Sequence, residues 1–218
     1  MLIALFIIVL WFAPAASAAS TAGTVMVLGD SLSAAYNIPS EKGWVALLDQ
    51  QMESTDCPGE VVNASISGET SFGGLSRLPD LLQRHQPSIV ILELGGNDGL
   101  RGMSVTQLYQ NLRDIAVKSA DAGARVVLAG IQIPTNYGAR YTREFAAAYP
   151  RLAEELGLPL IPFLLEGVAL EPELLQADGI HPTADAQPVI LDNVLPVLAP
   201  MLDGCLPETF TKQTFTNQ

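Results

Sequence analysis

A serine, a histidine and an aspartate stand in this chain at positions from which they could act together on an acyl bond. Ser31 lies in the turn at residues 29–33, directly after the apolar run at residues 24–28. His181 follows Asp178 by three residues in a short Asp-Gly-Ile-His-Pro loop. A serine hydroxyl becomes a nucleophile when a base such as imidazole accepts its proton, and a carboxylate fixes the tautomer of that imidazole. These residue types therefore indicate nucleophilic hydrolysis.

The elements that must position these side chains are predicted from the alternation of apolar strand patterns with helix patterns. The expected strands cover residues 24–28, 60–64, 89–94, 125–129 and 160–162. The expected helices cover about residues 44–52, 75–85, 105–122, 143–156 and 184–202. Strands that alternate with helices form parallel sheets, which carry their chemistry at the carboxyl ends of the strands. The predicted fold class is α/β, a three-layer α/β/α sandwich with a central parallel sheet of about five strands.

Four short blocks contain the triad candidates and further residues at the ends of expected strands. They are Gly29-Asp30-Ser31-Leu32-Ser33, Gly68 within residues 65–70, Gly95-Gly96-Asn97-Asp98, and Asp178 with His181. In order and spacing these blocks resemble the SGNH (GDSL) hydrolases, over about residues 25–200. The resemblance is strongest to the group of bacterial thioesterases, lysophospholipases and arylesterases in that superfamily. It implies the flavodoxin-like SGNH hydrolase fold and a serine esterase activity.

The resemblance also assigns roles to residues in the four blocks. The implied catalytic triad is Ser31, Asp178 and His181. The implied oxyanion hole consists of the backbone N–H groups of Ser31 and Gly68 and the side-chain amide of Asn97. A glycine suits its position because a backbone N–H approaches a substrate most closely where no Cβ intervenes. Asp30 is next to the nucleophile, but the resemblance gives the triad carboxylate to Asp178, so a structural role is expected for Asp30.

Apolar residues in two loops are the candidates for binding an acyl chain. In the group that the chain resembles, the loop after the asparagine block and the loop after the fourth strand line an acyl groove. Here these loops contain Leu100, Met103, Ile133 and Pro134. Burial of one such side chain is worth up to about 1.5–3 kcal/mol, and packing within its own loop is the alternative for each. The expected partners are small acyl esters and lysophospholipids, with Arg101 as one candidate for a phosphate contact.

The composition limits the classes of function that the chain can have. Its 218 residues suffice for one well-buried domain, and no repeat or long linker divides them. Asp and Glu outnumber Lys and Arg by 23 to 11, and the basic residues form no run, which argues against nucleic-acid binding. The sequence has no P-loop, G-x-G-x-x-G, H-E-x-x-H or clustered Cys/His motif. We therefore expect a monomer whose chemistry needs no cofactor and no metal.

The amino terminus has the pattern of an export signal. Residues 2–13 form an almost unbroken apolar run, and Ala16-Ser17-Ala18 fits the A-x-A pattern of a signal-peptidase site. The run is shorter than the ~20 residues of a spanning helix, although an uncleaved anchor is the alternative because no Lys or Arg precedes it. The predicted organisation is a signal peptide at 1–18, an SGNH hydrolase domain at 19–206 and a mobile polar tail at 207–218. A periplasmic or secreted protein without a stable membrane span after cleavage is expected.

Cys57 and Cys205 are the only cysteines of the chain. They lack the C-x-x-C spacing of a redox motif and are too few to form a metal site alone. Because an exported protein enters an oxidising compartment, one disulfide between them is expected, with two separate thiols as the alternative. Each would follow a helix that runs antiparallel to the strands, so both are expected at the end of the molecule opposite the Ser31 turn.

The hypothesis from the sequence is an exported serine esterase that hydrolyses acyl esters and thioesters through an acyl-enzyme intermediate on Ser31. Two alternatives stand beside it. A carbohydrate O-acetylesterase of the same superfamily would need an open, polar cleft, whereas the loops named above are apolar. A lipid-binding protein would keep this fold without turnover, and the presence of all four blocks argues against it.

Overall fold

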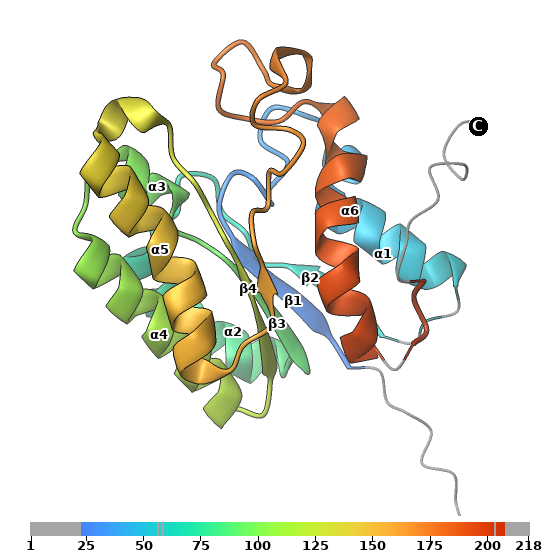
Figure 1. Cartoon of the computed structure of the whole chain (residues 1–218). Coiled ribbons are helices and arrows are strands. Elements are labelled where there is room, and N and C mark those ends of the chain that lie inside the picture. The colour runs from blue at the N-terminus through green and yellow to red at the C-terminus, as the bar shows by residue number, and fades with distance from the viewer. Residues whose placement is uncertain (1–22, 56, 58, 203, 208–218) are drawn as a thin grey trace, which may run out of the picture.

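A five-stranded parallel sheet runs through the middle of the described part of the chain (Figure 1). The computed structural model describes residues 23–55, 57, 59–202 and 204–207. In spatial order the strands are β2 (Val61–Asn63), β1 (Val25–Gly29), β3 (Ile89–Glu93), β4 (Arg125–Ala129) and β5 (Leu160–Ile161). Every neighbouring pair is parallel, which confirms the predicted fold class. The predicted signal peptide (1–18) and residues 208–218 of the predicted tail lie outside the described residues.

The two central strands, β1 and β3, are buried along their whole length because helices cover both faces of the sheet. Their residues are apolar except for Gly29 and Glu93, which end the two strands and are paired in the register. These two residues therefore lie side by side at the carboxyl edge of the sheet. β5 is an edge strand, as the proline at position 162 predicted.

Helices form the two outer layers (Figure 1). On one face lie α1 (Trp44–Ser54) and α6 (Gln187–Leu198), which pack against each other. On the other face lie α2 (Ser71–His85), α4 (Val105–Asp121) and α5 (Ala139–Leu156). The short helix α3 (Gly96–Leu100) follows β3, and a long loop between β5 and α6 lies over the carboxyl edge of the sheet. No helix in the described ranges is both long and apolar enough to cross a bilayer.

Five short 3-10 turns complete the described chain. They are η1 (Ser40–Lys42), η2 (Thr135–Tyr137), η3 (Pro172–Leu174), η4 (Ala184–Ala186) and η5 (Ala199–Leu202). The last predicted helix, at residues 184–202, is therefore regular only in its middle. η4 precedes α6 and η5 follows it. Pro188 and Pro196 of this stretch lack the backbone N–H group that a regular helix uses as a donor.

Two helices, α2 and α5, begin four residues earlier than the apolar pattern predicted. α2 begins at Ser71, where the Thr70 hydroxyl accepts a hydrogen bond from the backbone N–H of Gly73. The first turn of α2 contains two glycines, so the helical spacing of apolar residues does not extend into it. Gly74 lies so close to Leu94 that a Cβ atom there would be 2.3 Å from Leu94 Cδ1. This glycine therefore allows α2 to pack tightly against the end of β3.

A disulfide joins Cys57 to Cys205, with their Cα atoms 5.2 Å apart. Cys57 follows the end of α1, and Cys205 follows η5 after α6. Both helices lead back to the amino-terminal edge of the sheet, where Glu60 pairs with Val25 at the start of β1. The bond is therefore at the end of the molecule opposite the Ser31 turn.

Candidate active site

Ser31 lies in a tight turn at the carboxyl end of β1. The backbone N–H groups of Ser33 and Ala34 donate to the carbonyl oxygen of Asp30, at 3.3 and 3.0 Å. The backbone N–H of Leu32 donates to Oδ1 of Asp30 at 3.0 Å. Asp30 thus closes the turn with both its carbonyl and its side chain, which is the structural role predicted for it. Ser31 is left with its hydroxyl toward the carboxyl edge of the sheet.

Glu93 supports this turn from below. Its Oε2 atom accepts hydrogen bonds from the Ser33 hydroxyl at 2.6 Å and from the backbone N–H of Asp30 at 3.1 Å. Gly29 makes room for this carboxyl group, because a Cβ atom at position 29 would lie 2.5 Å from Oε2. Burial, with a smaller contribution from the Asp30 carboxylate, raises the pKa of Glu93 well above its usual range.

From the sequence, Glu93 was predicted only as part of an apolar strand, and its supporting role was not predicted. One signal pointed to it. An acidic residue that ends a strand buried on both faces needs hydrogen-bond donors nearby. The turn after β1 supplies them, but the sequence does not say which neighbouring strand β3 would meet.

The side chains of Ser31, His181 and Asp178 form a continuous line of hydrogen-bonding atoms. Nε2 of His181 is 3.0 Å from Oγ of Ser31, and Nδ1 is 2.7 Å from Oδ2 of Asp178. Oδ1 of Asp178 accepts the backbone N–H groups of Ile180 at 2.9 Å and His181 at 3.0 Å. The backbone hydrogen bond from His181 is the largest cause that lowers the pKa of Asp178 to about 2. This carboxyl group is therefore ionised in neutral and mildly acidic solution.

The loop that carries Asp178 and His181 is closed at its base. Leu175 and Pro182 form an antiparallel bridge. The backbone N–H of Gln176 donates to the His181 carbonyl at 2.7 Å, and the Gln176 side chain donates to the Pro182 carbonyl at 2.9 Å. These bonds hold the three-residue spacing between the carboxylate and the imidazole in one short loop.

Asn97 lies in α3, directly after β3, and its side chain reaches the Ser31 turn. Nδ2 of Asn97 donates to Oδ2 of Asp30 at 3.0 Å. Burial raises the pKa of Asp30 from 3.8 to about 6, although its hydrogen bonds from Leu32 and Asn97 oppose that effect. Gly96 is close to the same carboxylate, with 3.0 Å between a Cβ atom at position 96 and Oδ2 of Asp30. Asp30 therefore connects the serine turn to the asparagine block.

Gly68 lies in the loop between β2 and α2, next to the serine turn. The loop runs beside the end of β1, because the backbone N–H of Ile66 donates to the Gly29 carbonyl at 3.1 Å. Gly68 has a positive φ of 81°, a conformation that favours glycine. Its carbonyl oxygen accepts a hydrogen bond from Nη2 of Arg101 at 3.1 Å. An exposed arginine from the asparagine block thus stands beside this glycine.

A second carboxylate, Asp98, fixes α3 against α2. It accepts the backbone N–H of Ser71 at 2.8 Å and the Ser71 hydroxyl at 2.6 Å. Asn111 of α4 donates to the same hydroxyl at 2.9 Å. All three side chains are buried. This network holds the segment on which Asn97 is placed.

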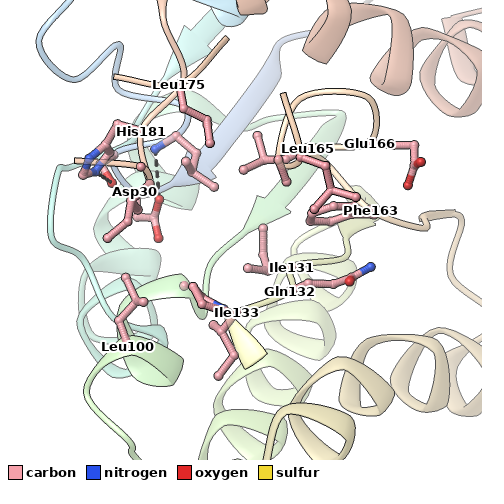
Figure 2. Close-up of a pocket in the computed structure, with 18 of the residues that line it drawn as sticks. Asp30, Leu100, Ile131, Gln132, Ile133, Phe163, Leu165, Glu166, Leu175 and His181 are labelled. Atoms are coloured by element: carbon pink, nitrogen blue, oxygen red, sulfur yellow. Dashed lines mark hydrogen bonds between the residues drawn. The ribbon is translucent and has the colours of Figure 1, made fainter. Parts of the chain in front are cut away.

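A cavity of about 720 Å³ opens beside Ser31 and His181. Figure 2 shows His181 and Asp30 at one side of it and Phe163 and Leu165 at the other, with Leu100 and Ile133 below. Three of the four residues predicted to bind an acyl chain line this cavity, namely Leu100, Ile133 and Pro134. Most of its lining side chains are apolar, so it suits a hydrocarbon group.

Met103 does not line the cavity, contrary to the prediction. The chain turns at Gly102, which has a positive φ of 63°, and the Met103 side chain is 37% exposed. The carbonyl oxygen of Met103 accepts a hydrogen bond from the Tyr141 hydroxyl at 2.7 Å. Met103 was predicted to bind an acyl chain only because it lies in an apolar loop. The turn at Gly102 directs its side chain away from the cavity.

The sequence analysis also missed the wall of the cavity that follows β5. The residues are Phe163, Leu165, Ala169, Leu170 and Leu175. They belong to the loop that lies over the carboxyl edge of the sheet in Figure 1. The available signal was positional, because this apolar segment directly follows the carboxyl end of a strand.

Among the described residues, no group of three or more His, Cys, Asp or Glu side chains is arranged to hold a metal ion. The chemical groups at the site are a hydroxyl, an imidazole and a carboxylate in line, with an amide beside them. On the carboxyl edge of a five-stranded parallel sheet, this combination is typical of serine hydrolases with a doubly wound α/β fold.

Comparison with known proteins agrees with this class. Residues 27–187 match the GDSL-like lipase/acylhydrolase family. The chain is 51% identical to esterase TesA of Pseudomonas aeruginosa over 84% of this chain and 91% of that protein. It is 48% identical to thioesterase 1/protease 1/lysophospholipase L1 of Escherichia coli over 91% of this chain and 92% of that protein. The chain therefore belongs to the GDSL-like lipase/acylhydrolase family.

A solved structure extends the comparison to three dimensions. The psychrotrophic esterase EstA from Pseudoalteromonas sp., in a structure inhibited by monoethylphosphonate, has a TM-score of 0.79 and 40% sequence identity. The match covers 83% of this chain and 98% of that one. The predicted family and the prediction of an ester or thioester hydrolase are confirmed by these relatives.

Proposed function

We propose that this chain is an exported serine esterase that hydrolyses acyl esters and thioesters, including lysophospholipids, through an acyl-enzyme on Ser31. The observation that carries the proposal is the line of atoms from Ser31 Oγ to His181 Nε2 (3.0 Å) and from His181 Nδ1 to Asp178 Oδ2 (2.7 Å). It lies at the wall of an apolar cavity large enough for a fatty chain.

In the first half of the reaction, His181 accepts the proton of the Ser31 hydroxyl while Oγ attacks the acyl carbon. The resulting imidazolium donates that proton to the departing alcohol or thiol, and the acyl group remains bonded to Ser31. Asp178, ionised because its pKa is lowered to about 2, keeps the Nδ1 proton in place and stabilises the imidazolium. In the second half, His181 activates a water molecule, which releases the fatty acid and regenerates the serine.

The negative oxygen of each tetrahedral intermediate needs donors close to Ser31. The proposed donors are the backbone N–H groups of Ser31 and Gly68 and the side-chain amide of Asn97. One hydrogen of that amide is directed at Asp30, which fixes the plane of the amide, and the other is free to meet the substrate. Loss of one such donor typically costs about 2.7–4 kcal/mol in the transition state.

The substrate class follows from the lining of the cavity. Leu100, Ile133 and Phe163 offer contacts to a hydrocarbon chain, and apolar side chains outnumber polar ones in the lining. This apolar majority of the lining favours fatty acyl esters over the substrates of a carbohydrate O-acetylesterase. Arg101, exposed beside Gly68, is the proposed contact for the phosphate of a lysophospholipid. The names of the relatives, an esterase and a thioesterase that is also a lysophospholipase, support this class.

The proposed location is the periplasm or the extracellular medium. The apolar run at residues 2–13 and the Ala16-Ser17-Ala18 site support it, as does the disulfide between Cys57 and Cys205. Mass spectrometry of the protein recovered from the native cell tests it. A mature amino terminus at Ala19 in an extracytoplasmic fraction is expected, and an intact Met1 in the cytosol would refute export.

The activity is tested with p-nitrophenyl esters from acetyl to palmitoyl. In Ser31→Ala and His181→Ala we expect kcat to fall at least about a thousandfold. His85→Ala is the matched control, because it removes the only other histidine, at the end of α2, and full activity is expected. Wild-type rates in Ser31→Ala would show that the serine assignment is wrong.

An alkyl phosphonate gives a second readout that separates an enzyme from a lipid-binding protein. We expect the mass of the wild-type protein to increase by one phosphonyl group on Ser31, and the mass of Ser31→Ala to stay unchanged. Phosphonylation of a serine requires that its hydroxyl group is activated as a nucleophile. Unlabelled wild-type protein, together with fatty-acid binding without turnover, would favour the lipid-binding alternative.

A further inference from the structure

The ring of Tyr36 packs on the imidazole ring of His181. The ring centroids are 4.3 Å apart, and the two planes are inclined by 38°. His181 lines the apolar cavity but Tyr36 does not, so the tyrosine covers a part of the imidazole that faces away from the cavity. The nitrogen atoms of the imidazole contact Ser31 and Asp178. The Tyr36 ring is therefore placed to oppose a tilt of the imidazole about the line between those two contacts.

The backbone around Tyr36 adopts a conformation that non-glycine residues rarely take. Ala35 has a φ of 55° and Asn37 a φ of 60°, and together with Gln86 they are the non-glycine residues with positive φ among those described. Alanine has no side-chain hydrogen bond to favour this region, so the rest of the structure must hold it there. Two such residues on either side of one tyrosine indicate that the backbone carrying its ring is constrained, although Tyr36 itself is 40% exposed.

The same segment is tied to the loop that carries the histidine. The side-chain amide of Gln176 donates to the Tyr36 carbonyl and to the Pro182 carbonyl, both at 2.9 Å. The backbone N–H of Tyr36 donates to the Ser31 carbonyl at 3.4 Å. Tyr36 is therefore connected to both the nucleophile turn and the imidazole loop, which are 150 residues apart in the sequence.

The electrostatics of an aromatic ring suit this position. The face of a phenol ring carries a partial negative charge, which attracts a cation placed over it. In the proposed reaction the imidazole becomes a cation in each transition state and is neutral in between. A ring packed on His181 therefore interacts more strongly with the transition state than with the ground state, which is the condition for raising kcat.

We infer that Tyr36 is a positioning residue for the proposed hydrolysis, which acts through His181 by holding the imidazole in line and stabilising its cationic form. The inference rests on the proposed function of Ser31, His181 and Asp178. It assigns Tyr36 no contact with the acyl chain, because this residue is outside the cavity lining.

The test compares Tyr36→Phe with Tyr36→Leu in the full-length protein, with p-nitrophenyl octanoate as the substrate. Phenylalanine keeps the aromatic face, and we expect its kcat to stay within about twofold of the wild-type value. Leucine keeps apolar bulk without that face, and we expect kcat to fall about threefold to tenfold with KM unchanged. Thermal unfolding of both variants serves as the control for a general loss of structure.

Three results would overturn the inference. A kcat within about twofold of the wild-type value in both variants would show that apolar bulk alone is sufficient. An equal loss in both would assign the effect to the hydroxyl group. A raised KM with unchanged kcat in Tyr36→Leu would make Tyr36 a contact for the substrate.

A proton NMR spectrum of the imidazole rings gives a readout that does not depend on activity. The chain has two histidines, so the resonances of His85 are an internal reference. At constant pH we expect the ring protons of His181 to shift in Tyr36→Leu, because the ring current of the tyrosine is lost. Unmoved His181 resonances would refute the ring contact itself, whereas activity retained in Ser31→Ala would refute the proposed function instead.

Discussion

The carboxyl group of Glu93 accepts a hydrogen bond from the Ser33 hydroxyl at 2.6 Å, within the turn that carries Ser31. This bond joins the end of β3 to the turn that follows β1. The same oxygen atom accepts the backbone N–H of Asp30, so one buried carboxyl group holds the residues on both sides of Ser31.

Glu93→Ala should destabilise the protein, and Glu93→Gln should not. Alanine leaves the Ser33 hydroxyl and the Asp30 N–H buried without an acceptor, at a cost of about 1–3 kcal/mol for each group. Glutamine keeps an oxygen at the Oε2 position, so we expect its free energy of unfolding to stay within about 1 kcal/mol of wild type. Urea denaturation at neutral pH measures both values. Equal stability of the alanine variant and the wild type would contradict the supporting role of Glu93.

Asp30 should make the stability of the protein depend on pH in mild acid. Because burial raises its pKa from 3.8 to about 6, the folded protein retains a proton between these values that the unfolded chain has released. The free energy of unfolding therefore falls as the pH rises through this window, by about 1–3 kcal/mol from this group. Asp30→Asn should lack this decrease. Parallel curves of unfolding free energy against pH for variant and wild type would show that Asp30 is not the group responsible.

Asn97→Ala tests the proposed oxyanion donor. We expect kcat to fall about a hundredfold to a thousandfold while KM changes little, because the amide is used mainly when negative charge forms on the substrate. Asn111→Ala is the matched control, since that residue of α4 donates to the Ser71 hydroxyl of α2 and not to the serine turn. It should lower stability, and its kcat should fall far less than that of Asn97→Ala. An equal kcat in Asn97→Ala and the wild type would show that Asn97 is not an oxyanion donor.

Leu100 ends α3 and Met103 follows it by three residues, yet only Leu100 of the two lines the cavity. Leu100→Ala should lower kcat/KM for octanoyl and longer esters about fivefold, which corresponds to about 1 kcal/mol of lost apolar contact. The rate on the acetyl ester should not change, because that acyl group is too short to reach this wall. Met103→Ala should leave the whole chain-length profile as in the wild type. The opposite pattern would mean that the acyl chain runs along another surface.

The sequence was sufficient for the parts of the protein that follow from local patterns and their order. The central strands are long apolar runs, so β1, β3 and β4 were predicted to within a residue. The carboxyl ends of parallel strands share an edge, which is why Ser31 and Asn97 were expected near each other. Asp178 and His181 were expected together because they share one short loop.

What the sequence did not reveal depends on contacts between distant segments. To predict the hydrogen bonds of Glu93, one must know that β3 is next to β1. To predict the packing of Tyr36 on His181, one must know the conformations of two loops. The wall that contains Phe163 and Leu165 follows a two-residue strand that carries little pattern of its own. Met103 was misplaced because one glycine turn decides the direction of the chain after α3.

The disulfide closes a covalent ring that contains only part of the candidate site. Residues 57–205 form a closed covalent ring, which contains Asp178 and His181 but leaves Ser31 on the amino-terminal arm outside it. A protease that cuts one peptide bond in this ring, for example beside Leu170, which is 91% exposed, opens the ring without releasing a fragment. A nicked molecule therefore keeps all three residues in one covalent unit until the disulfide is reduced.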